Sequence, residues 1–157
     1  MADVQHKDLP NAQLHEPKGV SAASVDTAYV ANGAGSGTWQ AAPYQYALNV
    51  RLTDLSTASD TYVVVPVGGK VAKIYTVIEN AITTADANLT FRINATLITS
   101  SAIVVTQVGS AAGDVDNSTP SALNTVVAGD KLKVTTDGAS DTTCAVNLTF
   151  LIKVGYA

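Results

Sequence analysis

Residues that could carry chemistry are spread along this chain rather than grouped. Hydrolysis of a glycosidic bond needs two carboxylates about 5 to 9.5 Å apart, one of them with a raised pKa. Most acidic residues after Pro43 fall in turn-like positions, where aspartate serves backbone geometry: Asp54, Asp60, Asp114, Asp116, Asp130, Asp137 and Asp141. Glu79 and Asp86 flank a loop, and nothing in the sequence pairs them. The sequence therefore predicts no catalytic carboxylate pair.

Nucleophiles and metal ligands are equally scarce. A nucleophilic triad needs histidine, and the only two, His6 and His15, lie in a segment without a rigid scaffold to hold them. Asp114, Asp116 and Asn117 faintly resemble a calcium loop, but the mid-loop glycine and the closing glutamate are missing. We interpret that stretch as a solvated turn. We expect no catalytic site, no metal site and no cofactor, and hence no enzyme.

The run NGAGSGTW, from Asn32 to Trp39, places Gly33, Gly35 and Gly37 before the only tryptophan of the chain. A glycine-rich loop can cradle a phosphate, but this one lacks the lysine of a P-loop and the spacing of a dinucleotide fingerprint. It also leads into a strand rather than into a helix N-terminus. We interpret the glycines as a joint, with Trp39 plugging a pocket on its own domain or on a partner.

The composition narrows the class of protein. Of 157 residues, 46% are hydrophobic, which is enough for a core, and the formal net charge is −4. The 9 lysines and arginines are scattered, so nucleic acid is a poor partner, and no apolar run approaches the roughly 18 residues of a membrane helix. Nothing resembles a signal peptide, and the single cysteine, Cys144, predicts a buried, inert thiol. We expect a soluble protein made in a reducing cytosol.

The pattern of the chain changes near Pro43. Residues 1–43 hold isolated hydrophobic residues among three of the five prolines, both histidines and the tryptophan. Such a segment cannot bury enough apolar area to offset its ordering entropy. We therefore expect residues 1–43 to be an extended N-terminal arm that is dispensable or folds on a partner, and residues 44–157 to be the body domain.

After Pro43, hydrophobic and polar residues alternate with a period of two, and glycine- and aspartate-rich turns separate the runs. About eight strands are predicted, at 44–52, 61–66, 70–79, 87–98, 102–107, 123–127, 131–136 and 143–155. The tetrapeptide Asn-Leu-Thr-Phe occurs at 88–91 and at 147–150, in both places where a strand would turn leucine and phenylalanine inward. The fold class is all-β: an antiparallel β-sandwich, with a jelly roll preferred.

Three predicted strands are apolar on both faces: Tyr62–Val65, Ile74–Ile78 and Ile103–Val105. A sandwich buries one face of each strand, so the second face needs a cover. Burial under a long loop is one explanation, and a subunit interface is the other. The candidates for the oligomer interface are Tyr62, Val64, Tyr75, Val77 and Val104.

Two stretches of the arm, His15 to Val20 and Tyr29 to Trp39, resemble an N-terminal element of tailed-bacteriophage virion proteins. These include capsid decoration (cement) proteins and head-fibre proteins, and the stretch from Tyr62 to Phe91 resembles their β-sandwich body more loosely. The resemblance implies a homotrimer whose arm binds the major capsid protein while the sandwich projects outward. It places the contacts in the arm at Leu14, His15, Glu16, Pro17, Lys18, Gly19, Val20, Tyr29, Val30, Gly33, Gly35, Gly37 and Trp39.

The expected function is therefore structural: a non-enzymatic protein, made in the bacterial host cytoplasm, that binds the outer capsid surface of the virion and stabilises or decorates the head. The alternative is a receptor- or carbohydrate-binding module of a phage head or tail fibre, with a host-surface glycan as its partner. Among the aromatic residues, only Tyr44 with Tyr46 hints at that alternative.

Overall fold

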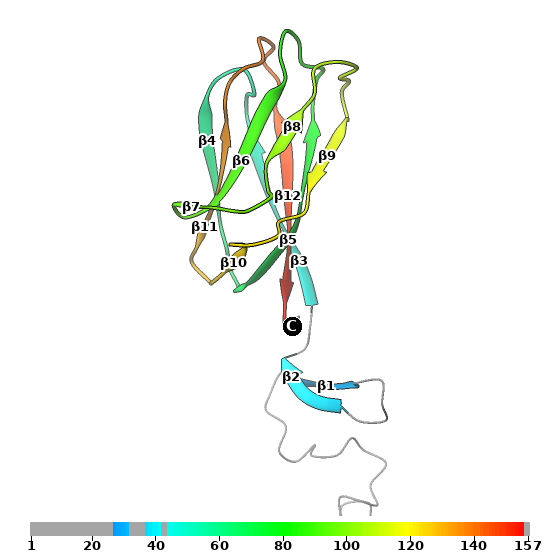
Figure 1. Ribbon diagram of the computed structural model, residues 1–157, viewed down its shortest axis with the longest axis vertical. Coiled ribbons are helices and arrows are strands. Elements are labelled where there is room, and N and C mark those ends of the chain that lie inside the picture. Colours follow the sequence, from blue (N-terminus) through cyan, green and yellow to red (C-terminus); the bar gives the residue numbers. More distant parts are fainter. Residues whose placement is uncertain (1–26, 32–36, 42–43, 156–157) are drawn as a thin grey trace, which may run out of the picture. The chain divides into compact units, whose positions relative to one another are not determined.

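The structure, a computed structural model, describes residues 27–31, 37–41 and 44–155. The chain divides into two compact units, one comprising Met1–Pro43 with Ala157 and the other Tyr44–Tyr156. Among the described residues all regular structure is β-strand (Figure 1), and no helix is long and apolar enough to cross a membrane.

The first unit contains a β-hairpin. Strands β1 (Thr27–Ala31) and β2 (Gly37–Ala41) pair antiparallel, with Tyr29 opposite Trp39 and Val30 opposite Thr38. The sequence predicts an extended arm without paired strands here. It does so because two five-residue strands are too short for their period-two alternation to stand out from the surrounding residues.

The second unit, hereafter the body, consists of two antiparallel sheets. The first sheet runs from β3 (Tyr44–Leu52) through β12 (Val146–Val154) to β5 (Gly69–Ile78), and the far edge of β5 pairs with β9 (Val115–Ser118) and β10 (Thr125–Val126). The second sheet runs from β4 (Ser59–Val64) through β11 (Lys131–Thr136) to β6 (Ala87–Ile93), and the far edge of β6 pairs with β7 (Thr96–Leu97) and β8 (Ile103–Val105).

The order of these strands defines the topology. Leaving aside the two-residue strands β7 and β10, the sheets read β3-β12-β5-β9 and β4-β11-β6-β8. Each successive strand then crosses to the other sheet, except that β6 and β8 are neighbours in one sheet. Eight strands connected in this way form a jelly roll, so the predicted fold class is confirmed.

The observed strands differ from the predicted ones at a few points. The bounds of β3 and β11 are as predicted, whereas the predicted strand 87–98 is divided by a turn at Asn94, whose φ is +53°. Asp116 and Asn117 lie in strand β9, whereas the sequence predicts a solvated turn for them, so that prediction is wrong. These two residues are poor strand formers, and their pairing with β5 outweighs that preference.

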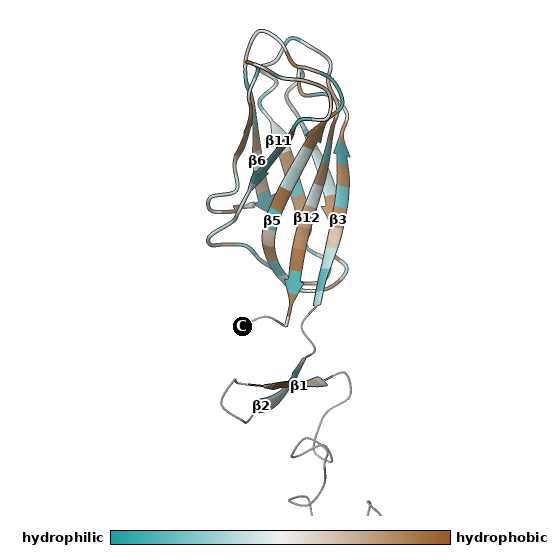
Figure 2. Ribbon diagram, turned by 90° about the vertical axis from the view of Figure 1, so that its right-hand side faces the viewer, coloured by the Kyte–Doolittle hydropathy of each residue, from teal (hydrophilic) through white to brown (hydrophobic). Residues whose placement is uncertain are grey.

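A single hydrophobic core lies between the two sheets. Its largest fully buried side chains are Phe91, Phe150, Leu52, Leu55, Ile74, Ile78, Ile82, Leu89, Ile98, Leu132, Leu148 and Ile152. Phe91 and Phe150 meet edge to face, with ring centroids 5.8 Å apart and planes 83° apart. Both copies of the Asn-Leu-Thr-Phe tetrapeptide turn leucine and phenylalanine inward, as predicted, and Figure 2 shows hydrophobic residues along β5 and β12. Cys144 is buried, also as predicted.

The free energy of unfolding should depend on where a leucine is truncated to alanine, because a buried leucine contributes more than an exposed one. Leu89 is fully buried, whereas Leu97 is 47% exposed on β7. We expect Leu89→Ala to lower the free energy of unfolding by about 2–5 kcal/mol through lost burial and a residual cavity, and Leu97→Ala by about 0.5 kcal/mol. Urea unfolding followed by far-UV circular dichroism measures both changes. Equal losses would contradict this assignment of the core.

Candidate functional site

One face of the hairpin in the first unit carries an aromatic pair. The rings of Tyr29 and Trp39 lie edge to face, with centroids 5.5 Å apart and planes 65° apart. Both side chains are partly buried, and their direct cross-strand pairing places them on the same face. Val30 and Thr38 form the next pair and lie on the opposite face. The hairpin thus has an aromatic face made by Tyr29 and Trp39.

Gly37 has a different role from the joint that the sequence suggested. It lies within β2 opposite Ala31, and a Cβ atom there would come within 2.9 Å of Cε1 of the Tyr29 ring and closer still to the carbonyl oxygen of Val30. Real Cβ atoms do not approach so closely, so this position requires glycine. The absence of a side chain at Gly37 leaves room for the Tyr29 ring to pack against Trp39.

The remaining residues assigned to the arm lie outside the described residues. They are Leu14, His15, Glu16, Pro17, Lys18, Gly19, Val20, Gly33 and Gly35.

The five candidates for the oligomer interface do not form one surface. Tyr62 and Val64 on β4 and Val104 on β8 lie on the outer face of the second sheet, 53%, 58% and 47% exposed. Tyr75 and Val77 on β5 are partly buried on the outer face of the first sheet. The alternative of burial under a long loop is therefore wrong for the three exposed residues.

The outer face of the first sheet holds a group of apolar side chains, which we call the β5 face and define as Tyr75, Val77, Val115 and Leu151. Asn117 and Thr149, which lie directly opposite Tyr75, interrupt the group. Val115 lies directly opposite Val77, and Leu151 comes from the neighbouring strand β12. At the margin, Lys73 places its Nζ 5.0 Å from the centroid of the Tyr75 ring.

A hydrogen-bonded ion pair lies on the same side of the sandwich. Arg51 donates to both carboxylate oxygens of Glu79, at 2.9 and 2.7 Å, and Asn147 donates to Glu79 at 3.1 Å. These bonds, with that of Arg51 foremost, lower the pKa of Glu79. The pair is exposed, so it contributes little to stability.

The Tyr44 and Tyr46 pair offers less surface than its sequence suggested. Their ring centroids are 6.4 Å apart, but Tyr46 packs against the core and its hydroxyl donates to the carbonyl oxygen of Val67. Burial raises the pKa of Tyr46. Only Tyr44 presents a largely exposed ring.

Several aspartates bind backbone amides, as their turn positions predicted. Asp54 accepts from the amide of Ser56 at 2.9 Å, and Asp130 from that of Val127 at 2.8 Å. In each case the pKa of the aspartate is lowered, chiefly by that bond. Asp60 is a correction, because it lies in β4 rather than in a turn.

Asp116 is a second correction and the one carboxyl among the described residues whose pKa is clearly raised. It lies in β9, and burial, followed by repulsion from Asp114, raises its pKa. Both residues line a depression of about 190 Å³ together with Ile78, Val105, Thr106, Val108, Gly109, Ser110 and Val115. Within the described part of the chain, no three His, Cys, Asp or Glu residues gather as metal ligands would.

The chain matches no protein-family model, and no curated protein matches its sequence significantly.

The role of Gly37 can be tested by tryptophan fluorescence, because Trp39 is the only tryptophan of the chain. We expect Gly37→Val to separate Tyr29 from Trp39 and to shift the tryptophan emission to longer wavelength. Thr38→Val is the control, because it adds no bulk and lies on the opposite face. The melting temperature of the body should not change, since its core comes from the second unit. An unchanged emission spectrum in Gly37→Val would disprove the role given to this glycine.

Proposed function

We propose that this protein is a non-enzymatic structural protein of a tailed-phage virion. Its N-terminal unit binds the major capsid protein on the outer surface of the head, and its jelly-roll body decorates or stabilises the shell. The observation that supports this most is the aromatic face of Tyr29 and Trp39. It lies on a unit distinct from the body and within the stretch that resembles the N-terminal element of phage virion proteins.

The physical properties of the hairpin favour a role in docking. A two-stranded hairpin is at best marginally stable in water, and this one has only five residues in each strand. Its two large rings are only partly buried. A groove on a capsid subunit would cover the exposed parts of both rings. Each ring buries on the order of 150–250 Å² when it is fully covered.

Only one of the two outer faces of the body can form the interface of the proposed trimer. In a closed trimer each subunit uses two different patches, and because these point toward neighbours only about 60° apart they can adjoin on one side of the subunit. Tyr62 and Tyr75 lie on opposite faces of the sandwich, so a threefold ring cannot close through both. We assign the interface to the β5 face, because interface cores are depleted in charge. The residues directly opposite Tyr75 and Val77 are uncharged, and Lys73 lies at the margin, whereas Lys133 lies directly opposite Tyr62.

A trimer with three N-terminal units would stabilise the capsid shell by binding several capsid subunits at once. Three N-terminal units on one trimer bind neighbouring capsid subunits with an avidity above that of a single unit. Each bound trimer then adds contacts that must break before the shell opens under the pressure of the packaged DNA.

The oligomeric state is directly measurable. Light scattering at micromolar concentration should give three times the 16.1 kDa chain mass. Val115→Asp places a charge in the β5 face and should yield monomers, whereas Val108→Asp, at an 81% exposed loop position, should remain trimeric. A monomeric wild-type protein would end the trimer proposal, and a trimeric Val115→Asp would move the interface elsewhere.

Capsid binding should depend on the aromatic face. Trp39→Ala should weaken binding of each arm roughly thirtyfold, because truncating a buried aromatic anchor commonly costs about 2 kcal/mol. The matched control is Gln40→Ala, at the adjacent exposed position on the other face of the hairpin. The measurement is occupancy on capsids of the source phage that lack this protein, with circular dichroism to verify the fold. Full occupancy by Trp39→Ala would refute the anchor.

A further inference from the structure

The outer face of the second sheet carries an open groove of about 780 Å³, lined by Tyr62, Arg92, Asn94, Ala95, Lys131 and Lys133. We call it the basic groove. A volume of this size lies within the range of small-ligand sites. Three of its six lining residues are cations, although the protein as a whole has a formal net charge of −4.

The register of three strands assembles the groove. Lys133 of β11 lies directly opposite Tyr62 of β4 on one side and Arg92 of β6 on the other. Two residues before Lys133, Lys131 lies beside Asn94, whose side-chain oxygen accepts the Lys131 amide at 3.1 Å. These side chains project from the outer face because Leu132, between the two lysines, points into the core.

One of the three cations is neutralised and two remain available. Lys133 Nζ lies 2.7 Å from Asp60 Oδ2, and hydrogen bonds from Lys133 and then Thr135 lower the pKa of Asp60. Arg92 donates one hydrogen bond, to the carbonyl oxygen of Ala95 at 3.2 Å, and Lys131 has no ion-pair partner among the described residues.

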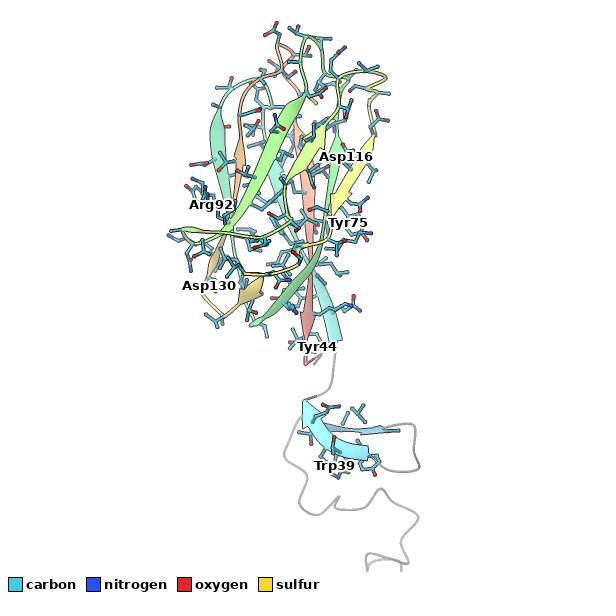
Figure 3. The ribbon with its side chains drawn as sticks, in the orientation of Figure 1. Trp39, Tyr44, Tyr75, Arg92, Asp116 and Asp130 are labelled. Carbon is cyan, nitrogen blue, oxygen red and sulfur yellow. The ribbon has the colours of Figure 1, made fainter. Side chains whose placement is uncertain are left out.

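A second carboxylate lies at the rim but is already engaged. Asp130 accepts from Asn94 Nδ2 at 2.8 Å and from the backbone amide of Val127 at 2.8 Å. These bonds come from neutral groups, so Asp130 keeps its negative charge. Arg92 and Lys131 stand outside the ion pairs of the described residues, and together they leave the groove with an excess of positive charge. Figure 3 labels Arg92 and Tyr75 on opposite sides of the body, so a trimer formed through the β5 face leaves the groove open.

The Tyr62 ring and the Arg92 guanidinium together indicate which anionic ligand the groove would bind. Tyr62 is 53% exposed, its hydroxyl donates a long hydrogen bond to Asp60 at 3.3 Å, and Lys133 Nζ lies over the ring, 6.0 Å from its centroid. An exposed ring offers a flat surface to the C–H face of a pyranose, while arginine binds a carboxylate through two parallel hydrogen bonds. Asn94 adds an amide at hydrogen-bonding range for hydroxyl groups.

We propose that the basic groove binds a carboxylated polysaccharide, with Tyr62 stacking on a uronate ring and Arg92 and Lys131 binding its carboxylates. Nucleic acid fits less well. Affinity for a phosphate backbone comes from many phosphate contacts, and only two cations of the groove, Arg92 and Lys131, stand outside the ion pairs of the described residues. The groove is independent of the capsid proposal, because its residues belong to the body alone.

Binding is tested with the full chain and polygalacturonate immobilised for biolayer interferometry. The matched ligand is the same polymer with its carboxylates methyl-esterified, and the competing polyanion is single-stranded oligothymidylate. We expect binding to polygalacturonate at least tenfold tighter than to either of the others. No binding to polygalacturonate, or equal binding to its ester, would overturn the proposal. Equal binding to oligothymidylate would assign the groove to nucleic acid.

Paired variants locate the site. Arg92→Gln with Lys131→Gln should weaken binding to polygalacturonate at least tenfold, and Tyr62→Ala about fivefold. The control is Lys70→Gln with Lys153→Gln, which removes the same charge from two lysines that lie opposite each other in the first sheet. An equal loss in the control would show that overall charge, rather than the groove, causes binding, and would overturn the assignment. These measurements use no capsid, so their failure leaves the capsid proposal standing.

Discussion

The contact between Phe91 and Phe150 determines the chemistry of both outer faces of the body. The two sheets share one layer of buried side chains, and these rings lie within it, edge to face. Because side chains alternate along a strand, turning Phe91 inward decides which residues of β6 face solvent. Register extends that choice to the neighbouring strands, where Val134 lies opposite Phe91 and where Leu48 and Ile74 lie opposite Phe150. A shift by one residue would exchange core and surface throughout the sheet.

The two outer faces differ in character although they enclose the same core. On the first sheet the residues directly opposite Tyr75 and Val77 are apolar or polar but uncharged, which suits contact with another copy of the chain. On the second sheet Tyr62 lies between paired and unpaired charges, which suits a hydrated, charged ligand. The hairpin with Tyr29 and Trp39 belongs to a different unit. Binding to the virion, trimerisation and binding of a polysaccharide, as proposed, therefore use three separate surfaces that can be occupied together.

Much of the fold was predictable from sequence because its signals are local, and most of the candidate sites were not. Strands β3 and β11 alternate cleanly over their whole length, and their bounds were predicted. Strand β9 and the hairpin were missed, because four or five residues carry too little pattern against turn-forming neighbours. The basic groove depends on register between Tyr62, Arg92 and Lys133, which lie far apart in the chain. Its only local signal was the alternation of Lys131, Leu132 and Lys133.

The position of β12 also determines the order in which the body can be completed during synthesis. It is the last of the body strands to be made, yet it lies between β3 and β5, and the hydrogen bond from Thr149 to Asn49 spans 100 residues. Phe150 belongs to β12, so Phe91 lacks its aromatic partner until this strand has been made. Contacts between residues so distant in sequence form slowly. The body therefore completes neither its first sheet nor its aromatic core contact until its last strand has been made, so its folding depends on residues from both ends of the domain.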